Sequence, residues 1–321
     1  MSSRDQMTKN DALCRAVRDR DQSRVREALK EGAEVNARDG NRETPLILAT
    51  MALSGSETVK VLIEAGADVN AVGGIKETAL MWATMAPDGG ETVKVLIEAG
   101  ADVNARDRIK ETALMKVAKR GGRKSIKALI EAGADVDVKD KDGRTALMKA
   151  AERGFGGCVK ALIDGGAEVN AVDALKQTAL MWATTAPDGG ETVKVLIEAG
   201  ADVDVKDKDG RTALMKAVKC GYEGGETVKV LIDAGADIEA RDMWGATVTN
   251  LAKSSPQYLE IIQTARSARR AAELDQKLNQ ACDSWAPPAA SSSTIKSRQT
   301  NQDTLTQAEQ QAPVSRSRQR F

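Results

Sequence analysis

The chain of 321 residues is long enough for two globular domains, yet only 8 of them are aromatic, and the apolar positions are mostly alanine, leucine, valine and isoleucine. Lysine plus arginine and aspartate plus glutamate both number 47, so no overall field attracts nucleic acid or an anionic membrane. Histidine is absent, which excludes Ser-His-Asp and Cys-His catalysis and every histidine-containing metal site.

Residues 1–10 lack the apolar core of an export signal, and no apolar run approaches the length of a membrane span. The four cysteines at 14, 158, 220 and 282 are far apart and form no CxxC pair, which favours free thiols in a reducing compartment. We therefore expect a cytoplasmic protein with no membrane contact. A nuclear location or delivery into a host cell stays open.

A motif of threonine followed by apolar residues recurs along the chain at intervals of 33 to 35 residues. Its copies begin at Thr44, Thr78, Thr112, Thr145, Thr178, Thr212 and Thr247. A Gly-Ala pair recurs with the same spacing, from Gly32 to Gly235. Such a period predicts a solenoid of stacked units, because one unit cannot bury its own apolar face.

Each unit reads as a pair of helices. Thr78 is placed to cap the first helix of its unit with its hydroxyl, and Pro45 suits the first helical position of an earlier copy. The stretch 87–90 (PDGG) breaks the first helix, and residues 92–99 resume at helical spacing. Gly100 then predicts a left-handed cap that ends the second helix.

The connector between units has a constant length, whereas the stretch between the two helices of a unit varies. Residues 139–144 (KDKDGR) carry turn chemistry within this connector. A two-stranded hairpin that projects from the stack is therefore predicted.

In period, order and spacing, the units resemble ankyrin repeats, whose consensus has a turn Asp, a turn Gly, Thr-Pro-Leu-His and then Gly-Ala-Asp-Val-Asn-Ala. The resemblance extends over roughly Asp11 to Leu278. It implies an all-α ankyrin-repeat solenoid of helix pairs with projecting β-hairpin loops. We expect disorder at 1–10, an array of about eight units with a long C-terminal helix at 11–282, and a disordered tail at 283–321.

Three departures from the consensus stand out. Apolar residues, mostly methionine, replace the motif histidine, as at Met81. The turn glycine is replaced by Arg42, Lys76, Lys110 and Lys176 in four units, which costs on the order of 1 kcal/mol each if the turns keep a positive φ angle. Gly73 replaces the turn aspartate.

No other chemistry-bearing motif is complete. The segment Asp140–Gly143 faintly resembles a calcium loop but has Val138 where an oxygen ligand is required. The segment 121–125 (GGRKS) has part of a phosphate loop but lacks the first glycine and a preceding strand, which favours a bend between helices. We therefore expect no enzyme, no catalytic residue, no metal and no cofactor.

Binding residues are expected where the units differ. In ankyrin-like proteins the position four residues after each threonine faces the concave side. Here that row includes two tryptophans that are candidate anchors, and it consists of Arg15, Leu48, Trp82, Lys116, Lys149, Trp182, Lys216 and Leu251. The alternative is that Trp82 and Trp182 only pack on neighbouring side chains.

Two further groups are candidates. Lys119, Arg120 and Arg153 extend a basic cluster that begins at Lys116 and suits an acidic segment, or is only a solvated helical face. The predicted hairpin tips carry apolar residues that indicate contact with a partner or with each other, namely Ile75, Ile109, Leu175 and Trp244.

The sequence thus predicts a monomeric, non-enzymatic scaffold that binds a protein partner through the concave helix face and the hairpin tips. One alternative is nucleic-acid or acidic-segment binding through the basic cluster, although the balanced total charge argues against nucleic acid. Another is a secreted effector of bacterial type that sequesters a host protein, because the C-terminal tail is basic.

Overall fold

The computed structural model describes residues 3–51, 55–86, 89–187, 189–220 and 224–284. Within these ranges the regular secondary structure is helical, apart from one isolated β-bridge. They are α1 (Ser3–Arg18), α2 (Gln22–Lys30), α3 (Pro45–Met51), α4 (Ser56–Glu64), α5 (Ala79–Ala83), α6 (Gly90–Glu98), α7 (Ala113–Ala118), α8 (Arg123–Glu131), α9 (Ala146–Glu152), α10 (Gly156–Asp164), α11 (Ala179–Ala183), α12 (Gly189–Glu198), α13 (Ala213–Cys220), α14 (Gly224–Asp233), α15 (Val248–Leu251), a 3-10 turn (Ala252–Ser254) and α16 (Pro256–Ser284).

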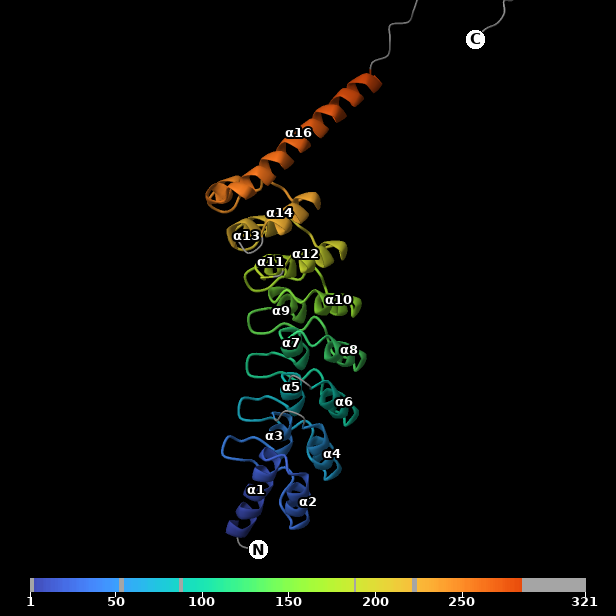
Figure 1. Cartoon of the computed structure of the whole chain (residues 1–321), viewed down its shortest axis with the longest axis vertical. Coiled ribbons are helices and arrows are strands. Elements are labelled where there is room, and N and C mark those ends of the chain that lie inside the picture. The colour runs from blue at the N-terminus through green and yellow to red at the C-terminus, as the bar shows by residue number, and fades with distance from the viewer. Residues whose placement is uncertain (1–2, 52–54, 87–88, 188, 221–223, 285–321) are drawn as a thin grey trace, which may run out of the picture. The chain divides into compact units, whose positions relative to one another are not determined.

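The chain divides into two parts, Met1–Arg266 and Ser267–Phe321. In the first part the helices form two layers (Figure 1). The inner layer consists of α3, α5, α7, α9, α11 and α13, and the second layer of α4, α6, α8, α10, α12 and α14. The connectors project beyond the inner layer. Of the second part, the structure describes the segment of α16 from Ser267 to Ser284, where Leu274 and Leu278 are exposed.

The predicted start of the first helix and the left-handed cap of the second helix are confirmed, whereas the break expected at 87–90 falls partly on 87–88, outside the described residues, and α6 already begins at Gly90. The Thr78 hydroxyl accepts a hydrogen bond from the Met81 N–H, and α3 begins at Pro45. Gly100 has a φ angle of +84°, as a left-handed cap requires. The core between the layers contains Leu80, Met81 and their equivalents in the other units, so the methionines that replace the motif histidine are packing residues.

The structure describes most of the N-terminal segment 1–10 but little of the predicted C-terminal tail. The expected disorder at 1–10 is wrong for residues 3–10, because these form the first half of α1. Gln6 and Lys9 in this segment donate hydrogen bonds to backbone carbonyls at 31 and 32, which tie it to the end of α2. Residues 285–321, most of the predicted tail, lie outside the described part of the chain. In the described part, no helix is both long and apolar enough to cross a membrane.

The connectors are tight turns that contain little strand. Within the Asp107–Glu111 turn, Asp107 N–H donates to Glu111 O at 3.0 Å, and Asp107 Oδ1 accepts from the N–H groups of Ile109 and Glu111. The bridge between Val72 and Thr78 is the β-type pairing that the described residues show. The turn is therefore held by the side chain of its aspartate together with backbone hydrogen bonds.

The four turns without glycine keep the strained backbone. Arg42, Lys76, Lys110 and Lys176 have φ angles of 67°, 63°, 63° and 58°. We expect the Lys110→Gly variant to raise the free energy of unfolding by about 0.5–1 kcal/mol, because glycine adopts this conformation without steric cost. Urea denaturation would measure the change.

The neighbouring turn offers a control of opposite sign. Gly143 also has a positive φ, but a Cβ added there would lie 2.8 Å from the backbone nitrogen of Ala174. The Gly143→Ala variant should therefore be destabilised. Equal stability of wild type and Lys110→Gly would show that the lysine turns carry no strain.

Candidate functional site

The row of side chains four residues after each repeat threonine is less accessible than the sequence predicts. Leu48, Lys116 and Lys149 are buried, and the exposed fractions of the two lysines are 8% and 4%. Trp82, Trp182, Lys216 and Leu251 are partly buried, whereas Arg15 is exposed. The prediction that the lysines present their charge to a partner is thus contradicted by their burial.

Lys116 is enclosed by carboxylates from two successive units. Its Nζ lies 2.6 Å from Glu77 Oε1, at the end of the preceding connector, and 2.8 Å from Asp107 Oδ2 in the turn of its own unit. Glu111 Oε2 is 3.5 Å away. The ammonium charge is therefore satisfied internally.

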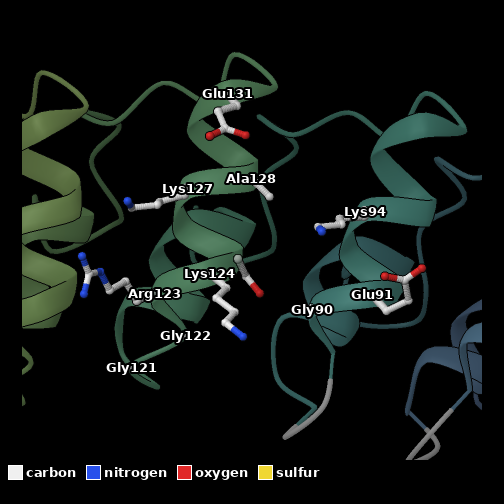
Figure 2. A pocket seen from close by; sticks show the side chains of 11 residues that line it. Gly90, Glu91, Lys94, Gly121, Gly122, Arg123, Lys124, Lys127, Ala128 and Glu131 are labelled. Atoms are coloured by element: carbon white, nitrogen blue, oxygen red, sulfur yellow. The ribbon is translucent and has the colours of Figure 1, made fainter.

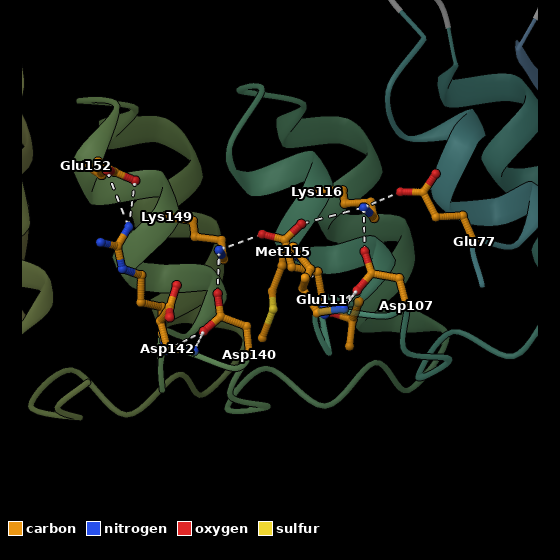
Figure 3. Close-up of polar contacts among 12 residues, drawn as sticks. Glu77, Asp107, Glu111, Met115, Lys116, Asp140, Asp142, Lys149 and Glu152 are labelled. Carbon is orange, nitrogen blue, oxygen red and sulfur yellow. Dashed lines mark hydrogen bonds and ion pairs between the residues drawn. The ribbon is translucent and has the colours of Figure 1, made fainter. Parts of the chain in front are cut away.

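Lys149 repeats this arrangement one unit further on. Its Nζ lies 2.6 Å from Glu111 Oε1 and 2.7 Å from Asp140 Oδ2. Because Glu111 contacts both lysines, the ion pairs form one continuous network across three units (Figure 3). We call it the charge ladder, and it consists of Glu77, Asp107, Glu111, Lys116, Asp140 and Lys149.

The pKa values follow from this geometry. Burial by itself lowers the pKa of the Lys116 and Lys149 ammonium groups, but the hydrogen bonds to carboxylates outweigh it and raise the pKa above its ordinary value. Burial likewise opposes ionisation of Asp140, yet the bonds from Lys149 and from backbone N–H groups lower its pKa. These shifts favour the charged forms of Lys116, Asp140 and Lys149, and the ion pairs of the charge ladder join adjacent units.

Sequence reasoning placed these lysines on the surface because it considered each helix alone. A signal was present in the residue that precedes the threonine, which is Glu77 or Glu111 in the units that supply Lys116 and Lys149 with a partner. Further along, Lys216 contacts Asp207 at 3.0 Å, and its side chain remains 13% exposed. In the unit before that of Lys216, the residue that precedes the threonine is Gln177 and not glutamate, so it offers no second carboxylate.

Trp182 is held at its edge and its face by two polar groups. Its Nε1 donates to Asp173 Oδ2 at 3.2 Å, and the guanidinium of Arg144 lies 3.8 Å from the ring centre. The ring packs on the core while part of it stays accessible. Trp182 is therefore an ordered, half-buried residue of the inner layer.

Trp82 occupies the same place in a unit with different neighbours. Residues 75–105 and 175–205 match at 26 of 31 positions, but Gly73 stands where the later unit has Asp173, and Glu43 where it has Arg144. A Cβ added at Gly73 would lie 2.0 Å from Glu43 Oε2. The Glu43 carboxylate thus fills the space of the missing aspartate.

The presence of Gly73 and Glu43 at these two positions leaves buried polar atoms without hydrogen-bond partners among the described residues. Glu43 Oε1 accepts from the Gly74 N–H at 3.2 Å, but the buried atoms Glu43 Oε2, Glu77 Oε2 and Trp82 Nε1 have no hydrogen-bond partner among the described residues. Burial, assisted by the charges of Asp39 and Glu77, raises the pKa of Glu43 although the Gly74 N–H opposes it. Among the described residues, the junction between the repeats of Thr44 and Thr78 therefore has the most buried polar side-chain atoms without a hydrogen-bond partner.

The hairpin tips carry exposed apolar side chains, as expected. Ile75, Ile109, Leu175 and Trp244 are 48%, 48%, 50% and 62% exposed, so the tips do not bury these side chains against each other. Backbone hydrogen bonds join successive tips, from Ile109 O to Lys141 N–H and so on to Met243 N–H. The tips from Ile109 to Trp244 therefore form one connected edge.

The remaining basic candidates lie where the inner layer meets the loops. Lys119, Arg120 and Arg153 are exposed, and together with Met85, Glu111 and the buried Lys116, whose charge is already paired, they line a cavity of about 440 Å³. The guanidinium of Arg120 donates to the backbone carbonyl of Met85 at 3.1 Å. Unlike Lys116 and Lys149, these three residues form no ion pair with a described carboxylate.

The capped helix pairs, the constant connectors and the linked tips define a helical repeat solenoid. A family model of ankyrin repeats in three copies matches residues 13–107, 80–173, 114–207 and 157–242. The chain therefore belongs to the ankyrin repeat family, whose members are generally protein-interaction modules and typically not enzymes. No curated protein sequence matches the chain.

Proposed function

We propose that the array is a scaffold that binds a protein partner along its hairpin tips, with Ile75, Ile109, Leu175 and Trp244 as the main anchors. The observation that carries the proposal is that exposed apolar tips recur along one connected edge, where Ile109, Leu175 and Trp244 alternate with charged tips; Ile75 lies on the preceding turn. Exposed large apolar side chains with polar residues around them mark interaction sites, and aromatic anchors contribute most to affinity.

The adjoining inner layer adds a second part to the proposed surface. The accessible edges of Trp82 and Trp182 lie on this layer, and the exposed charges of Lys119, Arg120 and Arg153 suit acidic groups of the partner. Lys116 and Lys149 have no part in it. We also propose a reducing compartment for this activity, which is supported by the free thiols of Cys14, Cys158 and Cys220.

The test uses a substitution for which the chain has its own precedent. Ile109 and Leu175 correspond to Asp142 and Asp209 in other units, so aspartate at these positions is compatible with the turn. We expect the Ile109→Asp, Leu175→Asp double variant to lose about 2–4 kcal/mol of binding free energy for its partner. Immobilised wild type and variant would be compared by quantitative mass spectrometry of captured proteins, followed by calorimetry with the captured partner.

A matched control is Met7→Asp, which removes an exposed apolar residue from α1, far from the tips in sequence. This variant should bind like wild type. The proposal is overturned if the double variant captures the same proteins with the same affinity as wild type.

A further inference from the structure

The N-terminus of α8 differs in charge from those of the other second-layer helices. Helices α4, α6, α12 and α14 carry a glutamate in the first turn, namely Glu57, Glu91, Glu191 and Glu226, and α10 begins with two uncharged glycines. Helix α8 has no acidic residue there and begins with Arg123 and Lys124. Cations at the positive end of a helix dipole are unfavourable, so this helix start is suited to an external anion.

A cavity of about 810 Å³ lies at this helix start, between α6 and α8. Lys94 from α6 and Lys124 from α8 extend into the gap, whereas Arg123 and Lys127 extend from α8 on its other side (Figure 2). Glu91 and Glu131 also line the cavity. Of the two carboxylates, Glu131 lies at the opposite end of α8 from Arg123 and Lys124, which leaves Glu91 as the carboxylate nearer to the start of α8.

The positive charges around this cavity are not neutralised within the described part of the chain. Lys94, Arg120, Arg123, Lys124 and Lys127 form no ion pair with a described residue. This contrasts with Lys116 and Lys149, whose charges the fold itself satisfies. The cluster is therefore available to a ligand.

Ser125 supplies an independent indication. It is 8% exposed, its Oγ has no hydrogen-bond partner among the described residues, and it faces α6, 3.9 Å from where a Cβ on Gly90 would lie. It lines both the cavity between α6 and α8 and an adjoining cavity of about 350 Å³ that reaches Arg120. The first-turn N–H groups of Lys124 and Ser125 lack intrahelical acceptors as well.

We propose that this cavity binds the phosphate group of a phosphorylated side chain on the partner polypeptide. The free N–H groups and hydroxyl at the start of α8 donate to the phosphate oxygens, while Lys124 and Lys94 neutralise its charge. The cavity is much larger than a phosphate ion, which fits an anion carried on a peptide segment. The inference deepens the proposed function, since it rests on a protein partner.

The experiment is a titration of the full chain followed by the backbone amide resonances of Lys124 and Ser125. The probes are a short alanine and glycine peptide with one phosphoserine, the same peptide without phosphate, and inorganic phosphate, all at constant ionic strength. We expect saturable shifts with the phosphopeptide, weaker binding of inorganic phosphate, and no effect of the unmodified peptide.

Variants locate the site. Lys124→Glu and Ser125→Ala should each weaken phosphopeptide binding by about tenfold. Ser125→Thr, which keeps the hydroxyl and matches Thr92 and Thr192 in other units, should bind like wild type, and so should Lys160→Glu on α10. The pair at Ser125 decides the matter even if the Lys124 variant folds poorly.

The inference is overturned if the phosphopeptide produces no saturable shift, if Lys160→Glu weakens binding as much as Lys124→Glu, or if Ser125→Ala binds like Ser125→Thr. It is also overturned if inorganic phosphate binds as tightly as the phosphopeptide, because the site then recognises a free anion. The titration needs no natural partner, so its failure is distinct from a failure of the tip variants in the capture experiment.

Discussion

Replacement of Lys149 by methionine is expected to lower the free energy of unfolding by about 3–5 kcal/mol. It leaves buried Asp140 without a counter-charge and leaves Glu111 with Lys116 alone, at 3.5 Å. Methionine fills a similar volume, so the loss reports the charge and not a cavity. Glu111 and Asp140, which lie within 2.7 Å of the Lys149 ammonium, would both remain in a site that excludes water. Urea unfolding followed by circular dichroism at neutral pH measures the change.

Lys216→Met is the matched control. Lys216 occupies the equivalent position but, among the described residues, pairs with Asp207 alone and keeps 13% of its side chain exposed, so the loss should be clearly smaller. Adding Asp140→Asn to Lys149→Met should recover part of the stability, since the carboxylate that lost its counter-charge is removed. Equal losses for the two lysine variants would contradict the assignment of the charge ladder as a buried network.

The same network predicts how stability depends on pH. The pKa of Asp140 is lower in the folded protein, so its stabilising effect is present above the unfolded pKa and is lost as the pH falls through the folded value. The pKa of Lys149 is raised, so its effect is present below the unfolded pKa and is lost as the pH rises through the folded value. In Lys149→Met both dependences should become weaker.

Replacement of Gly73 by aspartate is expected to destabilise the protein by about 1–3 kcal/mol, although aspartate is the residue that most other turns carry. The new Cβ would lie 2.0 Å from Glu43 Oε2, and a third carboxylate would enter a buried site that already holds Glu43 and Glu77. Thermal unfolding monitored by circular dichroism gives the change in stability.

In a background with Glu43→Ala, the same substitution should change sign. The aspartate introduced by Gly73→Asp could then accept the N–H groups of the turn, as Asp107 does, and the Nε1 proton of Trp82, as Asp173 does from Trp182. We therefore expect the double variant to be more stable than Glu43→Ala alone. If Gly73→Asp stabilises the wild type, Glu43 does not occupy the place of the turn aspartate.

Much of the fold could be predicted because its determinants are local. The Thr78 cap, the Gly100 turn and the apolar spacing around Leu80 each act within a few residues, and they recur in every full unit. The exposure of Ile109 and Leu175 at the tips also followed from local turn chemistry. Helix formation at 3–10 was missed because it depends on contacts with α2.

The candidate site was harder to predict, because its character depends on which units are neighbours. Lys116 and Lys149 read as surface charges until the preceding unit brings Glu77 or Glu111 within 2.6 Å. Trp82 and Trp182 have nearly identical local sequences, yet Arg144 lies over Trp182, whereas in the unit of Trp82 the carboxylate of Glu43 fills the space of the turn aspartate. The lysine and glutamate residues that pair in the charge ladder are 38 or 39 positions apart in the sequence, so no local pattern reveals them.

The repeat, its helix pairs, its turns and the apolar tips could all be derived from the amino-acid sequence, since short-range sterics and hydrogen bonding specify these features within one unit. By contrast, only the tertiary structure decided which charged side chains are paired inside the stack and which are free to bind a ligand. The physical reason is that stacking removes water from the inner layer, so a lysine is either paired by a carboxylate of the adjacent unit, as Lys149 is, or left free at the surface, as Lys124 is.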